Sequence, residues 1–115
     1  MITLDALVTP LQGKLIVPDT AGHPVRTVVA SDLMSDVLVV TSEDFLLVTS
    51  LASDQMIRTA DLVGASGVIL VNSKQPPASS LKLATDLGIA LLVTPLPKFE
   101  ACLAIGATLA TGDSR

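Results

Sequence analysis

The chain has 115 residues, of which 50% are hydrophobic and 16% are charged, and its mean hydropathy is +0.67. This length suits one domain, and a composition so rich in Val, Leu and Ile excludes a disordered chain. The longest apolar runs fall far short of the roughly 18 residues that a membrane span requires. We therefore expect a single globular domain over residues 1–115, with no membrane partner.

Charge and aromatic content argue against nucleic acid as a partner. The net charge is −4, and the seven basic residues are scattered along the chain. A nucleic-acid-binding surface needs several Lys or Arg side chains on one face, and often aromatic rings on which bases stack. The only aromatic residues are Phe45 and Phe99.

Cys102 is the only cysteine, so the chain has no internal disulfide. This usage fits a cytoplasmic protein, and the start of the chain lacks the pattern of a signal peptide. Cys102 lies in the apolar stretch 101–104, which favours a role as a small buried hydrophobic residue. One His and one Cys far apart do not make a zinc site, and we expect neither a metal nor another cofactor.

The first half of the chain carries short and irregular signals. Apolar residues at helical spacing, β-branched runs and turn residues define the elements there. In chain order we expect a helix at 3–11, a strand at 15–17, a loop at 19–24, a strand at 25–30 and a short helix over 31–37 capped by Ser31 or Asp32.

The second half is regular, because helices that end at glycine alternate with continuous apolar strands. In order we expect a strand at 45–49, a helix at 53–63, a strand at 68–71, a helix at 79–87, a strand at 89–93 and a helix at 98–110. Strands that are apolar at every position are buried on both faces, as in parallel sheets covered by helices. The fold class that follows is α/β, a three-layer sandwich with a small parallel or mixed sheet.

Motifs for catalysis are absent. The chain has no phosphate-binding glycine loop and no nucleophile elbow. Asp32 and Asp36 stand four residues apart, which suits either a pair of carboxylates for acid–base chemistry or a helix cap and a solvated face. His23 lies in a turn and is expected to be a surface residue. Arg26 suits either an anion clamp or a surface salt bridge.

Polar residues gather where the predicted parallel strands end. In open α/β sheets ligands bind at the carboxyl ends of the strands, where helix N-termini also point. A small anionic ligand there is one interpretation. The other is structural, with a helix cap at Ser53, a turn at Asn72 and a loop held by Thr94. The candidate ligand-binding residues are Thr49, Ser53, Asn72, Ser73, Lys74 and Thr94.

The last predicted helix is apolar on nearly every side, so more than one of its sides must be covered. Together with the apolar excess of the chain, this predicts a contact with a second copy. The candidate interface residues are Phe99, Leu103, Ile105 and Leu109.

Three stretches carry a family resemblance: Ala30-Ser31-Asp32-Leu33-Met34-Ser35-Asp36-Val37, Gly67-Val68-Ile69-Leu70-Val71-Asn72, and Gly88-Ile89-Ala90-Leu91-Leu92-Val93-Thr94-Pro95-Leu96. In this order, and followed by Phe99-Glu100, they resemble the DRTGG domain family over nearly the whole chain. The resemblance implies the fold of the MurF/HPr kinase N-terminal domains. The HPr kinase domain of this kind is not the catalytic one.

Members of that family occur alone near iron-hydrogenase genes, and fused to CBS domains in regulatory pyrophosphatases or to phosphotransacetylase-type enzymes. The resemblance therefore implies a regulatory or assembly domain that pairs with itself, with a larger enzyme or a hydrogenase-associated protein as partner. The chain departs from the family at its name-giving motif. Where the family has Arg-Thr-Gly-Gly, this chain has Arg26-Thr27-Val28-Val29, and β-branched residues do not reproduce the backbone freedom of glycine.

The leading functional hypothesis is a non-catalytic regulatory or accessory domain that acts through homodimerisation and protein–protein assembly. The alternative is a sensor of an adenine nucleotide such as AMP, bound at the carboxyl ends of the strands. A hydrolase using Asp32 and Asp36 is a third hypothesis, and we expect the chain not to be an enzyme.

Overall fold

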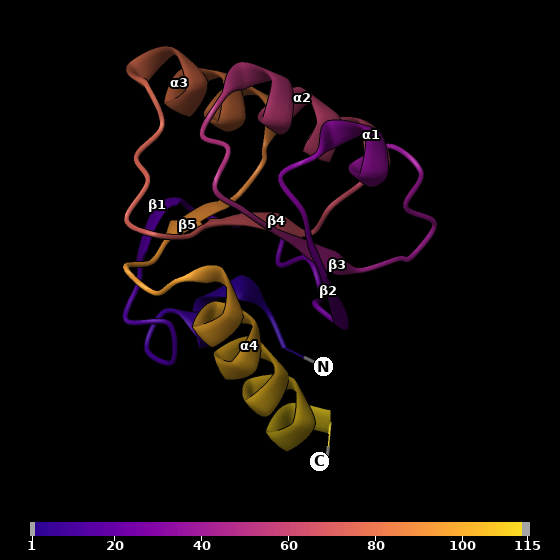
Figure 1. Cartoon of the computed structure of the whole chain (residues 1–115), viewed down its shortest axis with the longest axis vertical. Helices are drawn as coiled ribbons and strands as arrows, with labels where there is room; N and C mark the ends of the chain where they lie inside the picture. Colours follow the sequence, from indigo (N-terminus) through magenta and orange to yellow (C-terminus); the bar gives the residue numbers. More distant parts are fainter. Residues whose placement is uncertain (1, 114–115) are drawn as a thin grey trace.

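Five strands form one mixed sheet in the order β1-β5-β4-β3-β2 (Figure 1). The structure is a computed structural model, and it describes residues 2–113. β2 to β5 are parallel, and β1 runs antiparallel to β5 at one edge. The strands are β1 (Lys14–Val17), β2 (Thr27–Ala30), β3 (Phe45–Thr49), β4 (Gly67–Leu70) and β5 (Leu91–Val93).

Helices cover both faces of this sheet, so the chain forms three layers (Figure 1). On one face lie α1 (Met34–Val37), α2 (Asp54–Val63) and α3 (Ala78–Leu87), and on the other lie α4 (Lys98–Asp113) and the 3-10 helix η1 (Leu4–Leu7). The predicted three-layer α/β fold is confirmed. Over residues 2–113, no helix combines the length and apolar content needed to cross a bilayer.

The central strands are buried on both faces, as their continuous apolar sequence predicts. Every residue of β3 and β4 is buried. Along β3, Phe45 and Leu47 enter the core cluster under α1–α3, whereas Leu46 and Val48 enter the cluster under α4 and η1. This alternation explains why polar residues first appear where the strands end.

The helix ends follow the predicted chemistry. The Ser53 hydroxyl accepts a hydrogen bond from the Met56 backbone N–H at 3.3 Å and caps α2. α2 and α3 end at Gly64 and Gly88, whose φ angles are +74° and +73°. Glycine adopts this left-handed conformation without steric cost, so both helices stop there.

Two predicted helices are shorter than expected. Only one 3-10 turn, Leu4–Leu7, forms within residues 3–11, because Pro10 lacks an N–H and disfavours helical backbone before it. In the segment 31–37 only Met34–Val37 is helical. Asp32 lies outside that helix, where its side chain bonds the end of β3.

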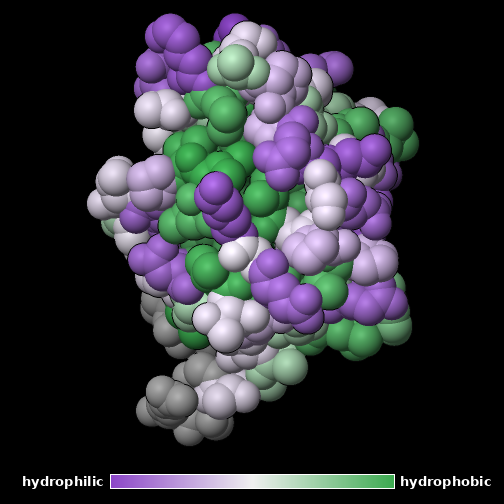
Figure 2. Space-filling view, turned by 90° about the vertical axis from the view of Figure 1, so that its left-hand side faces the viewer, coloured by the Kyte–Doolittle hydropathy of each residue, from purple (hydrophilic) through white to green (hydrophobic). Residues whose placement is uncertain are grey.

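The side of the molecule formed by α3 and β1 shows a hydrophobic patch in the space-filling view (Figure 2). Ile16 of β1 and Leu81 and Leu83 of α3 are only partly buried against the core beneath them. The ladder between β1 and β5 is irregular between Leu15 and Val17, and Pro18 follows. Irregularities and prolines make an exposed edge a poor template for adding another strand.

Candidate functional site

At the carboxyl end of β3, a carboxylate of the chain itself occupies the predicted ligand position. The Thr49 hydroxyl donates to Asp32 Oδ1 at 2.8 Å. The Ser50 backbone N–H donates to the same oxygen at 2.7 Å, and the Ser50 hydroxyl donates to Oδ2 at 2.8 Å. Thr49, one of the six residues predicted to bind an anionic ligand, therefore donates to a carboxylate of the chain itself.

Lys98, the first residue of α4, completes this cluster by donating to Asp32 Oδ2 at 2.7 Å. Partial burial raises the pKa of Asp32, but the hydrogen bonds from Lys98, Ser50 and Thr49 together outweigh burial and lower the pKa well below its usual range. The ionised carboxylate thus joins the β2–α1 connection, the end of β3 and the start of α4.

Asp36 does not join this cluster. It lies on α1, is exposed, and makes no side-chain hydrogen bond or ion pair within residues 2–113. The described part of the chain also brings together no group of three or more His, Cys, Asp or Glu side chains that would suit a metal ion. The interpretation of Asp32 as a structural residue is the one that its contacts support.

The order of the strands does not favour a ligand crevice along β2 to β5. Each of these strands pairs with the next one in the chain, and α1, α2 and α3 all lie on one face (Figure 1). Crevices for ligands form where the strand order reverses, and there is no reversal among these four. The pairing changes from parallel to antiparallel between β5 and β1.

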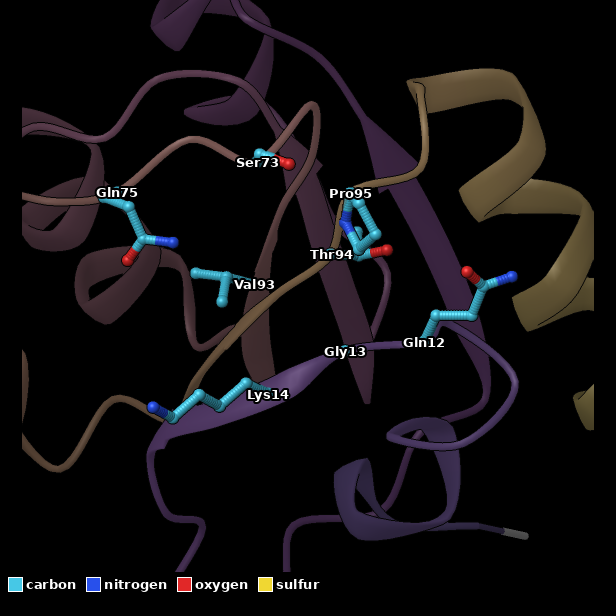
Figure 3. A pocket seen from close by; sticks show the side chains of 8 residues that line it. All are labelled: Gln12, Gly13, Lys14, Ser73, Gln75, Val93, Thr94 and Pro95. Carbon is cyan, nitrogen blue, oxygen red and sulfur yellow. The ribbon is translucent and has the colours of Figure 1, made fainter.

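A pocket of about 240 Å³ lies at that place, next to the end of β5 (Figure 3). Two of the predicted ligand-binding residues, Ser73 and Thr94, line it. The full lining is Gln12, Gly13, Lys14, Ser73, Gln75, Val93, Thr94 and Pro95.

Close packing of β1 against β5 forms one wall of this pocket. A Cβ atom at Gly13 would lie 2.6 Å from Leu92 Cδ2 and 2.8 Å from the Val93 carbonyl oxygen, so only glycine fits there. The Thr94 hydroxyl donates to the Leu11 carbonyl and accepts from the Leu96 backbone N–H at 3.1 Å. Thr94 thus fastens the end of β5 to the segment before β1.

A tight turn after β4 forms the opposite wall. Asn72 and Ser73 both have φ of +58°, and the Lys74 N–H donates to the Val71 carbonyl at 3.1 Å. The backbone N–H groups of Asn72 and Ser73 donate to Leu96 and Thr94 carbonyls, each at 2.9 Å. All three residues of this turn are exposed, and Ser73 is the one that lines the pocket, with Asn72 and Lys74 on either side of it.

The six predicted ligand-binding residues therefore separate into three places. Thr49 lies in the Asp32 cluster, Ser53 caps α2, and the other four lie at or next to the pocket. Sequence reasoning missed Gln12, Gly13, Lys14 and Gln75. The Gln12-Gly13 pair before a predicted strand was a turn signal, but the pairing of that strand with β5 had no local signature.

The two other polar candidates have partners on the surface. His23 Nδ1 lies 2.9 Å from Asp19 Oδ1 in the loop before β2. Arg26 donates through Nε to Asp44 Oδ2 at 2.8 Å. Of the two roles predicted for Arg26, an anion clamp and a surface salt bridge, the structure shows the salt bridge. Val28 and Val29, in place of the family's glycines, form ordinary positions of β2.

The four predicted interface residues differ in exposure. Phe99 and Leu103 are 68% and 56% exposed on α4, and Leu109 is half-buried. The predicted interface role of Ile105 is wrong, because this residue is fully buried against the chain's own sheet and offers no surface to a partner. Cys102 is half-buried in the same cluster; burial raises the pKa of its thiol, and the nearby Lys98 charge opposes this.

No family model matches the chain, and no curated protein matches it. A solved structure that it resembles holds the CBS and DRTGG domains of the regulatory region of Clostridium perfringens pyrophosphatase, complexed with the activator diadenosine tetraphosphate. The TM-score is 0.76 at 19% identity, over 93% of this chain and 47% of that chain. The chain thus spans about half of that structure. This likeness concerns the fold, and it shows that the chain has the DRTGG-like α/β fold that its motifs predict.

Proposed function

We propose that the chain is a non-catalytic regulatory or accessory domain that acts by pairing with a second copy through α4. The observation that carries the proposal is the exposed side of this helix. Phe99, Leu103, Ala107 and Ala110 are all exposed, at spacings that place them along one side of α4. A solvated helix normally carries charged residues on such a side, but none occurs from 101 to 112.

The pattern along this exposed side suits a second copy in particular. Its large residues, Phe99 and Leu103, lie toward the start of α4, and its small residues, Ala107 and Ala110, lie toward the end. In a two-fold dimer the same surface meets itself in opposite directions. Two antiparallel α4 helices would therefore set the large side chains of one copy against the small ones of the other.

A second apolar surface is less accessible. On the α3 and β1 side, Ile16, Leu81 and Leu83 are half-buried within their own chain (Figure 2). Phe99 and Leu103 keep more than half of their surface free. Since association gains most from apolar area that is still exposed, α4 is the better of these two surfaces for pairing.

The regulatory role rests on the fold and on the described site residues. The resembling structure is a regulatory region, and Asp32, Thr49 and Ser53 form structural contacts here. By the resemblance of its motifs, the pair would dock on a larger enzyme or a hydrogenase-associated protein. A cytoplasmic location agrees with the single half-buried cysteine.

Light scattering coupled to size-exclusion chromatography at tens of micromolar protein tests the proposal. We expect a dimer for the native chain and a monomer for Leu103→Lys. The matched control is Leu62→Lys, because Leu62 is 75% exposed on α2, away from α4. A monomeric native chain, or equal effects of both substitutions, would contradict pairing through α4.

The second candidate function is binding of an adenine nucleotide such as AMP at the strand ends. It is favoured by the structure that the chain resembles, which holds diadenosine tetraphosphate. A ligand that binds only the folded state raises its unfolding temperature. A thermal-shift series with AMP at millimolar concentration therefore tests it, and an unchanged transition would remove this candidate.

A further inference from the structure

We propose that the pocket between β5 and β1 binds a compact oxyanion, a small carboxylate or phosphate compound, with Lys14 as its cationic contact. The pocket lies at the one place where the sheet changes from parallel to antiparallel pairing. This proposal does not depend on pairing through α4.

Four polar side chains that line the pocket have no side-chain partner in the described part of the chain. Gln12, Lys14, Ser73 and Gln75 make no side-chain hydrogen bond or ion pair within residues 2–113. They come from two separate segments, and Figure 3 shows Ser73, Gln75 and Lys14 placed around Val93, with Gln12 beyond Thr94. Amide, hydroxyl and ammonium groups together supply the donors that an oxyanion needs.

The charge around the pocket is positive in an acidic chain. No Asp or Glu lines the pocket, although the whole chain has a net charge of −4. Lys82 and Lys98 are neutralised by Asp86 and Asp32, whereas Lys14 has no ion-pair partner among the described residues. An anion is therefore the ligand class that this charge favours.

The backbone supplies an independent argument. Four residues other than glycine have positive φ in the described chain, and three of them, Gln12, Asn72 and Ser73, line or adjoin this pocket. Glycine would adopt these conformations without steric cost. Side chains held in strained backbone cluster at ligand-binding sites, and here they include two polar groups of the lining.

Size and composition limit the ligand. The volume of about 240 Å³ is below the common range for sites of drug-sized ligands. The lining contains no aromatic side chain on which a base would stack. Gly13, Val93 and Pro95 are the lining residues without a polar side chain. The pocket therefore fits an oxyanion with a short body better than a whole nucleotide.

Nuclear magnetic resonance titration of the full ¹⁵N-labelled chain tests this inference. The probes are sodium phosphate, sodium succinate and AMP, each added to about 50 mM, with sodium chloride at matched ionic strength as the blank. We expect saturable shifts with phosphate or succinate, confined to the amides of residues 12–14 and 73–75. Lys14→Met keeps the aliphatic stem and should weaken binding about tenfold or more.

Lys82→Met is the matched control, since Lys82 lies on α3, pairs with Asp86 and does not line the pocket; it should leave the affinity unchanged. Gln75→Leu, on the other segment, should weaken binding as well, so the test does not depend on one variant. Absent shifts, shifts equal to those of chloride, or full binding by Lys14→Met would overturn the inference. Binding of AMP alone would overturn it in favour of a nucleotide site.

Discussion

Removing the Asp32 carboxylate should destabilise the domain although the residue lies at the surface. Asp32 accepts hydrogen bonds from Thr49, Ser50 and Lys98. Thr49 is fully buried, so in Asp32→Ala its hydroxyl loses its acceptor where water has little access, at a cost of about 1–3 kcal/mol. The Lys98 pair is 36–39% exposed and adds at most about 1 kcal/mol. We expect a total loss of about 2–3 kcal/mol.

Urea unfolding followed by far-ultraviolet circular dichroism measures this loss, because the chain has no Trp or Tyr for fluorescence. Asp36→Ala is the control, since Asp36 is exposed and has no side-chain partner within residues 2–113, and it should leave stability unchanged. The double variant Asp32→Ala/Thr49→Val removes both partners, so its cost should be about 1 kcal/mol less than the sum of the single costs. Equal stabilities of Asp32→Ala and Asp36→Ala, or strict additivity, would refute the reasoning.

The remaining predictions concern packing, backbone, pH and the thiol. Gly13→Ala should lower the free energy of unfolding by about 1–3 kcal/mol, because its Cβ would lie 2.8 Å from the Val93 carbonyl oxygen. Gly106→Ala, where a Cβ meets open space in α4, should not lower it in the same urea assay. Ser73→Val should cost about 1–2 kcal/mol while Ser73→Gly costs nothing, because φ is +58°; equal unfolding midpoints would contradict this. The pKa of Asp32 is lowered in the folded state, so its stabilisation is present above the unfolded carboxyl pKa of about 3.9 and is lost as the pH falls below it. The difference in unfolding free energy between the native chain and Asp32→Asn should therefore shrink in acid. A difference that stays constant from neutral pH downwards would contradict this. Burial raises the pKa of the Cys102 thiol, so Ellman's reagent at neutral pH should react with it more slowly in the folded chain than in denaturant, and equal rates would disprove the protection.

The second half of the fold was predictable because its signals are local. A Ser cap, a glycine stop and a continuous apolar run each act within a few residues, so the predicted strand 45–49 and helix 53–63 match β3 and α2 with its cap. The first half was less predictable because its local signals conflict. Only one turn of the helix at 3–11 forms, because Pro10 opposes the extension that the apolar spacing favoured.

The site was predictable only where it depends on strand ends. Ser73 and Thr94 were found because each follows a parallel strand. The Asp32 cluster joins residues 17, 18 and 66 positions apart, and no periodicity predicts such pairs. Gln12 and Lys14 reach the pocket only because β1 pairs with β5, and that choice of partner is a tertiary property of the sheet.

That pairing also has a consequence for the order in which the domain assembles. β2 to β5 pair with their neighbours in the chain, so each contact closes a short loop. The pairing of β1 with β5 instead joins opposite ends of the sequence, Lys14 to Val93, and must close a much longer loop. We expect this ladder to form late and to open first in amide hydrogen exchange. The pocket exists only while the ladder between β1 and β5 is formed, so any occupant of the pocket would slow amide exchange in β1.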